Sequence, residues 1–127
     1  MPLKAALIED NENNRYLLRL LLEHAGFEVV MAADGKCGVE MVRREAPDIV
    51  LLDIQMPEMD GYEVAAVIKS DPVLARIPVV GVSSFAMPGD RDKALRLGFA
   101  GYIEKPVDPE RFAQSVTMFL KGEKGPP

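Results

Sequence analysis

Five short apolar runs recur along the chain, and each is followed by a longer segment in which apolar residues have a different spacing. The runs are brief and rich in valine and isoleucine, as β-strands are. The third and fourth runs are almost wholly apolar, which is typical of strands buried on both faces of a parallel sheet. We therefore predict strands at Lys4–Ile8, Glu28–Ala32, Ile49–Leu52, Val79–Val82 and Tyr102–Ile103.

The segments between these runs carry apolar residues three and four apart, which is the spacing of an amphipathic helix. A leucine stripe predicts a helix over Asn14–Ala25, and Gly26 can end it in the left-handed conformation. A second helix is expected over Gly35–Glu45 and must end near Pro47. Three further helices are expected to begin near Asp60, Asp90 and Pro109.

Two of these starts carry specific capping signals. Asp60 and Glu63 have the spacing of a capping box, with aspartate in place of serine or threonine. Asp108 can cap the last helix, and Pro109 suits its first helical position. Strand and helix thus alternate five times, which predicts a doubly wound α/β fold with a five-stranded parallel sheet and right-handed crossovers.

Length and composition narrow the picture. A chain of 127 residues suits one domain, expected over residues 1–121, with the Gly/Pro-rich residues 122–127 as a flexible tail or the start of a linker. The net charge of −5 argues against direct nucleic-acid binding, which favours a basic surplus. The N-terminal apolar stretch is short and interrupted by Lys4, so we expect no signal peptide and no membrane insertion. The single cysteine, Cys37, fits a reducing, cytoplasmic setting.

Polar residues gather where the predicted strands end, and in an open α/β sheet that edge holds the functional site. Three of them are acids, and bringing three carboxylates together is costly because like charges repel. Either proton uptake or a bound cation relieves this repulsion, and oxygen-only ligands favour a hard cation such as Mg²⁺. The residues are Glu9, Asp10, Asp53, Ser83, Ser84 and Lys105.

Such a set of groups is suited to phosphoryl transfer. The metal and Lys105 would neutralise negative charge on the transferred group, and Ser83 would donate its hydroxyl. Asp53 would attack phosphorus and become an aspartyl phosphate. No general base is required, because a carboxylate is already ionised at neutral pH.

Four stretches occur in an order and at spacings that resemble the receiver domains of response regulators, the CheY-like family. They are ALIEDNENNR, DIVLLDIQMPEMDGYEV, IPVVGVSSFAMPGD and GYIEKPV, and the resemblance runs from Lys4 to about Leu120. It implies the strand order 2-1-3-4-5. It also implies a phosphorelay protein that takes a phosphoryl group from a sensor histidine kinase or histidine phosphotransfer protein. Such a domain catalyses only its own phosphorylation and dephosphorylation, and signals to a downstream protein through its fourth helix, fifth strand and fifth helix.

The resemblance assigns roles to individual residues. Asp53 corresponds to the phosphoacceptor, and Glu9 and Asp10 correspond to the acidic pair that binds Mg²⁺ together with it. Gln55 falls where the family offers a backbone carbonyl to the metal, and Gln55 and Phe85 both sit where the family tunes phosphoryl lifetime. Mn²⁺ is an alternative to Mg²⁺ at such a site.

The same resemblance marks a group of switch residues. Ser83 corresponds to the switch hydroxyl, Tyr102 to the switch aromatic and Lys105 to the family's lysine. Pro106 is expected to follow a cis peptide bond. Ser84 departs from the usual alanine but is still small enough to admit a phosphoryl group. On phosphorylation, Tyr102 is expected to move inward.

Two further features are open to interpretation. Tyr16 and Leu20 lie four apart and off the main stripe of the first helix. They are either scattered exposed apolar side chains or a docking patch for a histidine phosphotransfer partner, which in the family packs against this helix. Phe85 is bulky, and we hypothesise that it shields the phosphoryl group from water. The FAMPGD stretch and the lack of an output domain are most like single-domain receivers or those of hybrid kinases.

Three other classes of protein agree less well with the sequence than a receiver domain does. A phosphohydrolase with an aspartyl-phosphate intermediate typically has a second acid two residues after the nucleophile, where this chain has Gln55. A receiver-like binding module without chemistry does not explain the complete set of acids with Lys105. A flavodoxin-like electron carrier needs a hydroxyl-rich phosphate loop after the first strand, and neither that loop nor a P-loop is present.

Overall fold

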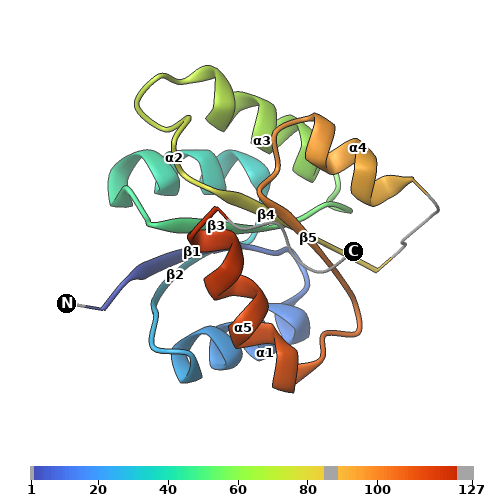
Figure 1. The fold of residues 1–127 in the computed structure, drawn as a ribbon. Helices are drawn as coiled ribbons and strands as arrows, with labels where there is room; N and C mark the ends of the chain where they lie inside the picture. The colour runs from blue at the N-terminus through green and yellow to red at the C-terminus, as the bar shows by residue number, and fades with distance from the viewer. Residues whose placement is uncertain (1, 85–88, 123–127) are drawn as a thin grey trace.

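The computed structural model of the chain describes residues 2–84 and 89–122, which form alternating strands and helices (Figure 1). The strands are β1 (Lys4–Ile8), β2 (Glu28–Ala32), β3 (Ile49–Asp53), β4 (Val79–Ser83) and β5 (Gly101–Glu104). The helices are α1 (Glu12–His24), α2 (Gly35–Glu45), α3 (Gly61–Ser70), α4 (Asp90–Arg96) and α5 (Pro109–Leu120). Phe85 and residues 123–127 lie outside the described residues, so the shielding role and most of the expected tail stay predictions.

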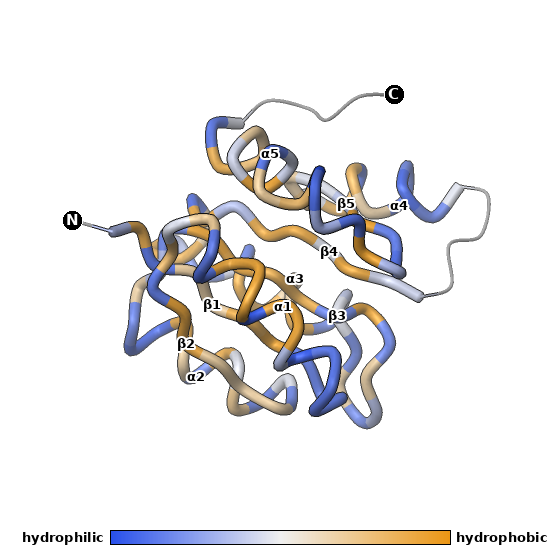
Figure 2. Tube along the Cα trace, turned by 90° about the horizontal axis from the view of Figure 1, so that it is seen from below, coloured by the Kyte–Doolittle hydropathy of each residue, from blue (hydrophilic) through white to orange (hydrophobic). Residues whose placement is uncertain are grey.

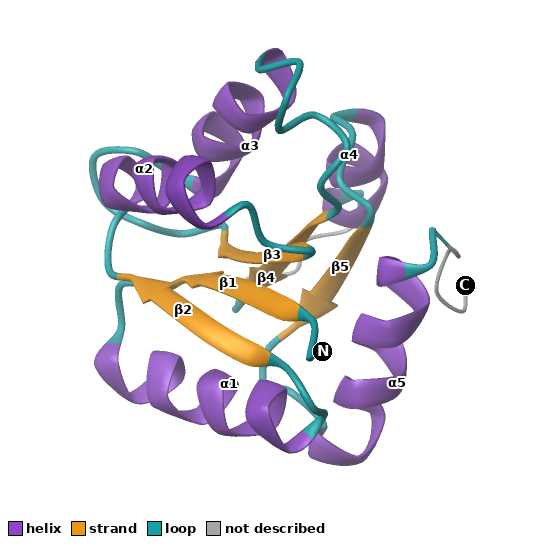
Figure 3. Cartoon of the chain, turned by 90° about the vertical axis from the view of Figure 1, so that its left-hand side faces the viewer, coloured by secondary structure: helices purple, strands orange, loops and turns teal. Residues whose placement is uncertain are grey.

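The strands form one parallel sheet in the order β2-β1-β3-β4-β5. Figure 3 shows α1 and α5 on one face of this sheet and α2, α3 and α4 on the other. The predicted doubly wound α/β fold is therefore confirmed. The chain begins at β1, pairs β2 on one side and then crosses to β3 on the other, so the order reverses beside β1. Ligands of such sheets bind at the carboxyl ends of the strands next to this reversal.

Two apolar layers hold the helices to the sheet. In β1, Ala5 and Leu7 belong to the layer under α1 and α5, whereas Ala6 and Ile8 belong to the layer under the other three helices. Every residue of β3 and β4 is buried, as their unbroken apolar runs predict. Figure 2 shows the hydrophobic colour along the central strands, whereas hydrophobic and polar segments alternate along helices such as α1 and α5.

Local capping sets where several helices start. Side chains of Asn11, Asp34 and Asp108 each accept a hydrogen bond from a backbone N–H in the first turn of α1, α2 and α5. Asp60 and Glu63 form the predicted capping box at α3. Such caps each stabilise a helix by about 1 kcal/mol. The first helix begins two residues earlier than its leucine stripe indicates, because Asn11 supplies the cap.

The ends of the strands differ slightly from the prediction. Both β3 and β4 extend one residue further, so Asp53 and Ser83 are the last residues of their strands rather than the first of the loops. Their backbones are therefore held in the sheet. Within residues 2–84 and 89–122, no helix is long and apolar enough to cross a membrane.

Candidate functional site

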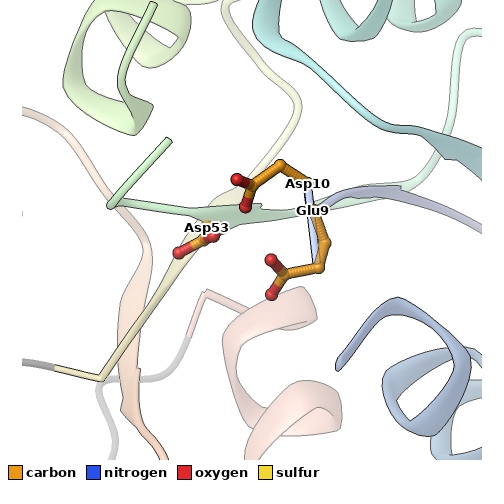
Figure 4. A group of neighbouring side chains, drawn as sticks. All are labelled: Glu9, Asp10 and Asp53. Carbon is orange, nitrogen blue, oxygen red and sulfur yellow. The ribbon is translucent and has the colours of Figure 1, made fainter. Parts of the chain in front are cut away.

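Three carboxyl groups meet at the carboxyl edge of the sheet. Glu9 and Asp10 follow β1, and Asp53 ends the neighbouring β3. Since Ile8 pairs with Leu52 in the sheet, the residues that follow them lie side by side. One oxygen from each of the three acids lies within 4.8 Å of the others. Figure 4 shows the side chains converging on a common space. Glu9 and Asp53 are buried and Asp10 is exposed, so the structure brings together the acids that the sequence analysis predicted.

This crowding changes the protonation of Asp53. Burial, together with the neighbouring Glu9 and Asp10 carboxyls, raises the pKa of the Asp53 carboxyl to about 8, against the opposing charge of Lys105. At neutral pH the carboxyl therefore holds a proton when nothing else relieves the repulsion. A hard dication placed among these oxygens would replace that proton. The donor set, three carboxylates without sulfur or imidazole, fits Mg²⁺.

Lys105 supplies the positive charge at this edge. Its Nζ donates a hydrogen bond to Glu9 Oε1 at 2.7 Å and lies 3.7 Å from Asp53 Oδ1. The Lys105 backbone N–H donates to the Ser83 carbonyl oxygen at 2.7 Å, which holds the lysine beside β4. The Lys105–Pro106 peptide bond is cis, as the resemblance implied.

The loop after β3 folds back tightly over Asp53. The Gln55 N–H donates to Asp53 Oδ1 at 3.1 Å, and the Gly61 N–H donates to the Ile54 carbonyl oxygen at 3.0 Å. A Cβ atom at Gly61 would lie 2.6 Å from the Asp53 carbonyl oxygen. Only glycine allows α3 to begin so close to the end of β3. This close approach explains the Asp60–Gly61 pair in the sequence.

The end of β4 presents the predicted serines. Ser83 is fully buried and Ser84 is exposed. The side chain of Gln55 reaches both: its Nε2 donates to Ser83 Oγ at 2.6 Å, and its Oε1 accepts from the Ser84 N–H at 3.3 Å. The resemblance predicts a backbone role for Gln55 at the metal and an influence on phosphoryl lifetime, but it does not predict this side-chain bridge. A long amide two residues after the buried acid was the available signal.

Tyr102 is a buried residue of β5, with 7% of its surface exposed. It belongs to the apolar layer that contains Ala94 and Phe99, and burial of the ring among apolar side chains favours this position. The expected inward movement of Tyr102 on phosphorylation stays a prediction.

Arg15 is a second residue that the sequence analysis missed. Its Nη1 donates to the Glu9 carbonyl oxygen at 2.9 Å and lies 3.5 Å from that of Asp10. The Asn11 N–H donates to Glu9 Oε2 at 3.2 Å. These contacts fix the loop that carries the acidic pair. A basic residue in the first turns of the helix after two acids was the only indication in the sequence.

The apolar pair on α1 lies on the surface, as predicted. Tyr16 is 58% and Leu20 is 41% exposed, and Leu17 beside them is 44% exposed. A hollow of about 150 Å³ lies next to Leu17, between α1 and the segment that follows β5. Its lining residues are Asn14, Leu17, Leu18, Lys105, Pro106 and Val107.

Known proteins are similar to this chain in sequence. The family model of the response regulator receiver domain matches residues 5–117. The chain is 38% identical over 120 residues to the polar-differentiation response regulator DivK of Brucella anthropi, covering 94% of this chain and 98% of DivK.

Solved structures agree with this match. The receiver domain of the sensor histidine kinase PA1611 from Pseudomonas aeruginosa, solved with a magnesium ion in its active site cleft, has a TM-score of 0.86 and 26% identity, covering 95% of this chain and 99% of that one. The chemotaxis protein CheY4 of Vibrio cholerae has a TM-score of 0.87 at 23% identity, covers 94% of this chain and 99% of that one, and supports the fold alone. The chain belongs to the response regulator receiver family, whose members are signalling domains of two-component systems rather than conventional enzymes.

Proposed function

We propose that Asp53 accepts a phosphoryl group from the phosphohistidine of a sensor histidine kinase or a histidine phosphotransfer protein, in a reaction that depends on Mg²⁺. One observation carries this proposal. The Asp53 carboxyl is buried beside Glu9 and Asp10, and the ammonium group of Lys105 lies 3.7 Å away. Structural stability alone does not explain so concentrated a set of charges, because the carboxylates repel one another.

The same acids provide a metal site. The carboxylates of Glu9, Asp10 and Asp53 and the backbone carbonyl of Gln55 would hold Mg²⁺, with Mn²⁺ as an alternative for the same oxygen ligands. When bound, the cation supplies positive charge that stabilises the oxygens of the transferred group. The magnesium ion of the Pseudomonas receiver supports this assignment by analogy.

The chemistry at Asp53 is a displacement at phosphorus. A carboxylate oxygen of Asp53 forms the new P–O bond while the bond from phosphorus to the donor's imidazole nitrogen breaks, and the electron pair stays on the imidazole. The raised pKa of Asp53 leaves a proton on it at neutral pH, contrary to the expectation of an ionised carboxylate, and a protonated carboxyl is a poor nucleophile. Asp53 would release this proton to water when Mg²⁺ binds, so that no general base is needed. Lys105 and the Ser83 hydroxyl then stabilise the negative oxygens, and Ser84 is small enough to leave room. Attack by water on phosphorus later restores Asp53.

Phosphorylation would signal through the far side of the site. Ser83 is the last residue of β4, and Lys105 directly follows β5. A shift of either residue toward new phosphoryl oxygens would therefore displace the segments next to α4 and α5. We propose that this changes the α4-β5-α5 face read by a downstream protein target, as a population shift between two states. Tyr102 would move inward in the phosphorylated state. The chain is proposed to act in the cytoplasm, without direct nucleic-acid binding.

The exposed apolar pair on α1 suits the protein donor. Tyr16 and Leu20 face solvent on the helix that follows the acidic pair, and Leu17 extends the apolar surface toward Lys105. We propose that a helical histidine phosphotransfer partner packs here, which would bring its phosphohistidine beside Asp53. Exchange of Tyr16 and Leu20 for serine should slow transfer from such a partner at least tenfold more than transfer from acetyl phosphate. Equal slowing of both reactions would contradict the docking role.

The direct test is phosphorylation by acetyl phosphate with Mg²⁺, followed by mass spectrometry of the intact chain and its peptides. One phosphoryl group is expected on Asp53, and it should be absent after Asp53→Asn exchange or chelation of the metal. Phosphotransfer profiling against candidate kinases would then identify the donor. Unlabelled wild-type protein would favour a binding module, and sustained turnover of a phosphomonoester would favour a phosphohydrolase.

A further inference from the structure

The side chain of Gln55 bridges the end of β4, a contact that the receiver chemistry described above does not use. We propose that the Gln55 amide is an intramolecular latch, which holds Ser83 and Ser84 while Asp53 is unmodified and releases them when a phosphoryl group arrives. Gln55 is in this view a positioning residue that acts through the two serines. The inference rests on the proposed function of Asp53.

Gln55 is attached at three points around the nucleophile. Its backbone N–H donates to Asp53 Oδ1 at 3.1 Å, its Nε2 donates to Ser83 Oγ at 2.6 Å, and its Oε1 accepts from the Ser84 N–H at 3.3 Å. An amide engaged through both its donor and its acceptor cannot turn about its last bond without breaking both contacts. The ends of β3 and β4 are therefore joined by a side chain as well as by the sheet.

The latch competes with the group that Asp53 is proposed to receive. The Ser84 N–H now donates to a neutral amide oxygen, whereas a phosphoryl group on Asp53 would offer charged oxygens close by. Hydrogen bonds to charged acceptors are about twice as strong as those between neutral groups. The Ser84 N–H would therefore transfer from Gln55 Oε1 to a phosphoryl oxygen, whereas Ser83 Oγ accepts from Gln55 Nε2 and serves as the anchor of the amide. Gln55 is largely exposed, so water can satisfy its released amide.

The free energy needed to open the latch lowers the affinity of the wild-type site for a phosphoryl group. The net effect of one neutral hydrogen bond corresponds to a factor of about 2 to 10 in an equilibrium constant. Loss of the Gln55 amide should therefore raise the affinity for a phosphoryl mimic by about 3-fold or more. The contribution should depend on Ser83, because its Oγ accepts from Gln55 Nε2 and so keeps Gln55 Oε1 on the Ser84 N–H.

The test is a titration with beryllofluoride and Mg²⁺ followed by fluorine NMR. Gln55→Met keeps the length of the side chain without its hydrogen bonds, and Gln55→Asn keeps the amide but shortens its reach. Both should bind beryllofluoride about 3-fold or more tightly than the wild type. In a Ser83→Ala background, Gln55→Met should change the affinity by less than about 2-fold. Unchanged or weaker binding by Gln55→Met in the otherwise wild-type chain would overturn the latch.

A second measurement detects the latch before any ligand is added. In the metal-free wild type, the Nε2 protons of Gln55 should differ in NMR shift from a solvated amide, and Ser83→Ala should move them to solvated values. Beryllofluoride with Mg²⁺ should move them in the same way. An already solvated Gln55 amide in the free protein would refute the proposal.

Different results would contradict the proposed function of Asp53 and the proposed latch of Gln55. A wild type that binds no beryllofluoride contradicts the proposed function of Asp53. It also contradicts the release of the latch, because that release requires a phosphoryl group on Asp53. A wild type that binds beryllofluoride through Asp53, with no effect of Gln55, contradicts the latch alone.

Discussion

Two lysine–glutamate pairs lie at opposite edges of the sheet. At the amino edge, Lys4 Nζ lies 3.0 Å from Glu45 Oε1, and at the carboxyl edge, Lys105 Nζ lies 2.7 Å from Glu9 Oε1. The pairs have the same chemistry but different access to water. Both side chains of the first pair are 27% exposed, whereas Lys105 is 13% and Glu9 only 1% exposed.

Each lysine also faces more than one acid. Lys4 is influenced by Glu28 and Asp48 in addition to its partner, just as Lys105 lies near Asp53 as well as Glu9. Yet the pKa values of the acids near the two lysines, Glu45 and Asp53, are shifted in opposite directions. The hydrogen bond from Lys4 lowers the pKa of Glu45, whereas burial raises that of Asp53. Exclusion of water, more than the number of charges, therefore distinguishes the candidate site from an ordinary surface cluster.

The largest expected difference follows removal of each lysine. Lys105→Met should lower the free energy of unfolding by about 3 kcal/mol at pH 7, because it leaves the buried Glu9 carboxylate without its partner. Lys4→Met should shift the urea midpoint only slightly, since water solvates Glu45. Urea denaturation followed by circular dichroism measures both. Similar shifts for the two variants would show that burial does not separate the pairs.

Removal of an acid should have opposite effects at the two edges. Without metal at pH 8, Asp53→Asn should raise the free energy of unfolding by about 2 kcal/mol, because the raised pKa reflects a destabilised carboxylate. The folded state of the wild type holds the Asp53 proton more tightly than the unfolded state. The penalty therefore builds up as pH rises from about 4 towards about 8, and the advantage of Asp53→Asn should disappear near pH 4.

Glu45→Gln is the matched control for this experiment. The pKa of Glu45 is lowered in the folded state, so its contribution to stability is present at neutral pH and is lost as the pH falls through the folded pKa. Glu45→Gln should therefore destabilise the protein at pH 8, in contrast to Asp53→Asn. Denaturation curves across this pH range give both signs, and a loss of stability in Asp53→Asn would contradict the interpretation of its raised pKa.

A dication should relieve the repulsion at one edge only. Magnesium at ten times its dissociation constant at pH 7 should stabilise the wild type by about 1.4 kcal/mol at that pH through mass action. With this magnesium concentration held fixed, the gain should increase between pH 6 and pH 8, because the cation displaces the proton of Asp53. It should fall sharply in Asp53→Asn and remain in Glu45→Gln. Thermal unfolding with sodium chloride at matched ionic strength separates specific binding from screening.

The smallest expected effect is that of salt on the lysine variants. Raising the ionic strength from 0.1 M to 1 M shortens the Debye length from about 10 Å to about 3 Å. The small cost of Lys4→Met should disappear under these conditions, while most of the cost of Lys105→Met should remain. Urea midpoints at the two salt concentrations make the comparison, and an equal response would mean that both pairs are equally screened.

Local patterns explain why most of the fold could be predicted. The apolar run Ile49–Leu52 specifies a buried strand, and the Asp60–Glu63 spacing specifies the start of α3, because both depend on neighbours in the chain. The convergence of Glu9, Asp10 and Asp53 could also be predicted from the sequence, because parallel strands place their carboxyl ends at one edge of the sheet.

Other features depend on how far side chains reach in the folded molecule. The bridge from Gln55 to Ser83 joins residues 28 apart, and no local spacing encodes it. Arg15 donates to backbone carbonyl groups, which are present at every position and leave no pattern in the sequence. The burial of Tyr102 depends on Phe99 and Ala94, which pack beside it only after α4 docks on the sheet.

The ion pair between Lys105 and Glu9 joins residues 96 positions apart, which has a consequence for the order of synthesis. The ribosome makes the acids that follow β1 first and their counter-charge only after four further strands. Until Lys105 has left the exit tunnel, a growing chain contains Glu9 and Asp53 without the ammonium group that balances them. If Asp53 accepts a phosphoryl group as proposed, the complete charge set for that reaction exists only once β5 has joined the sheet.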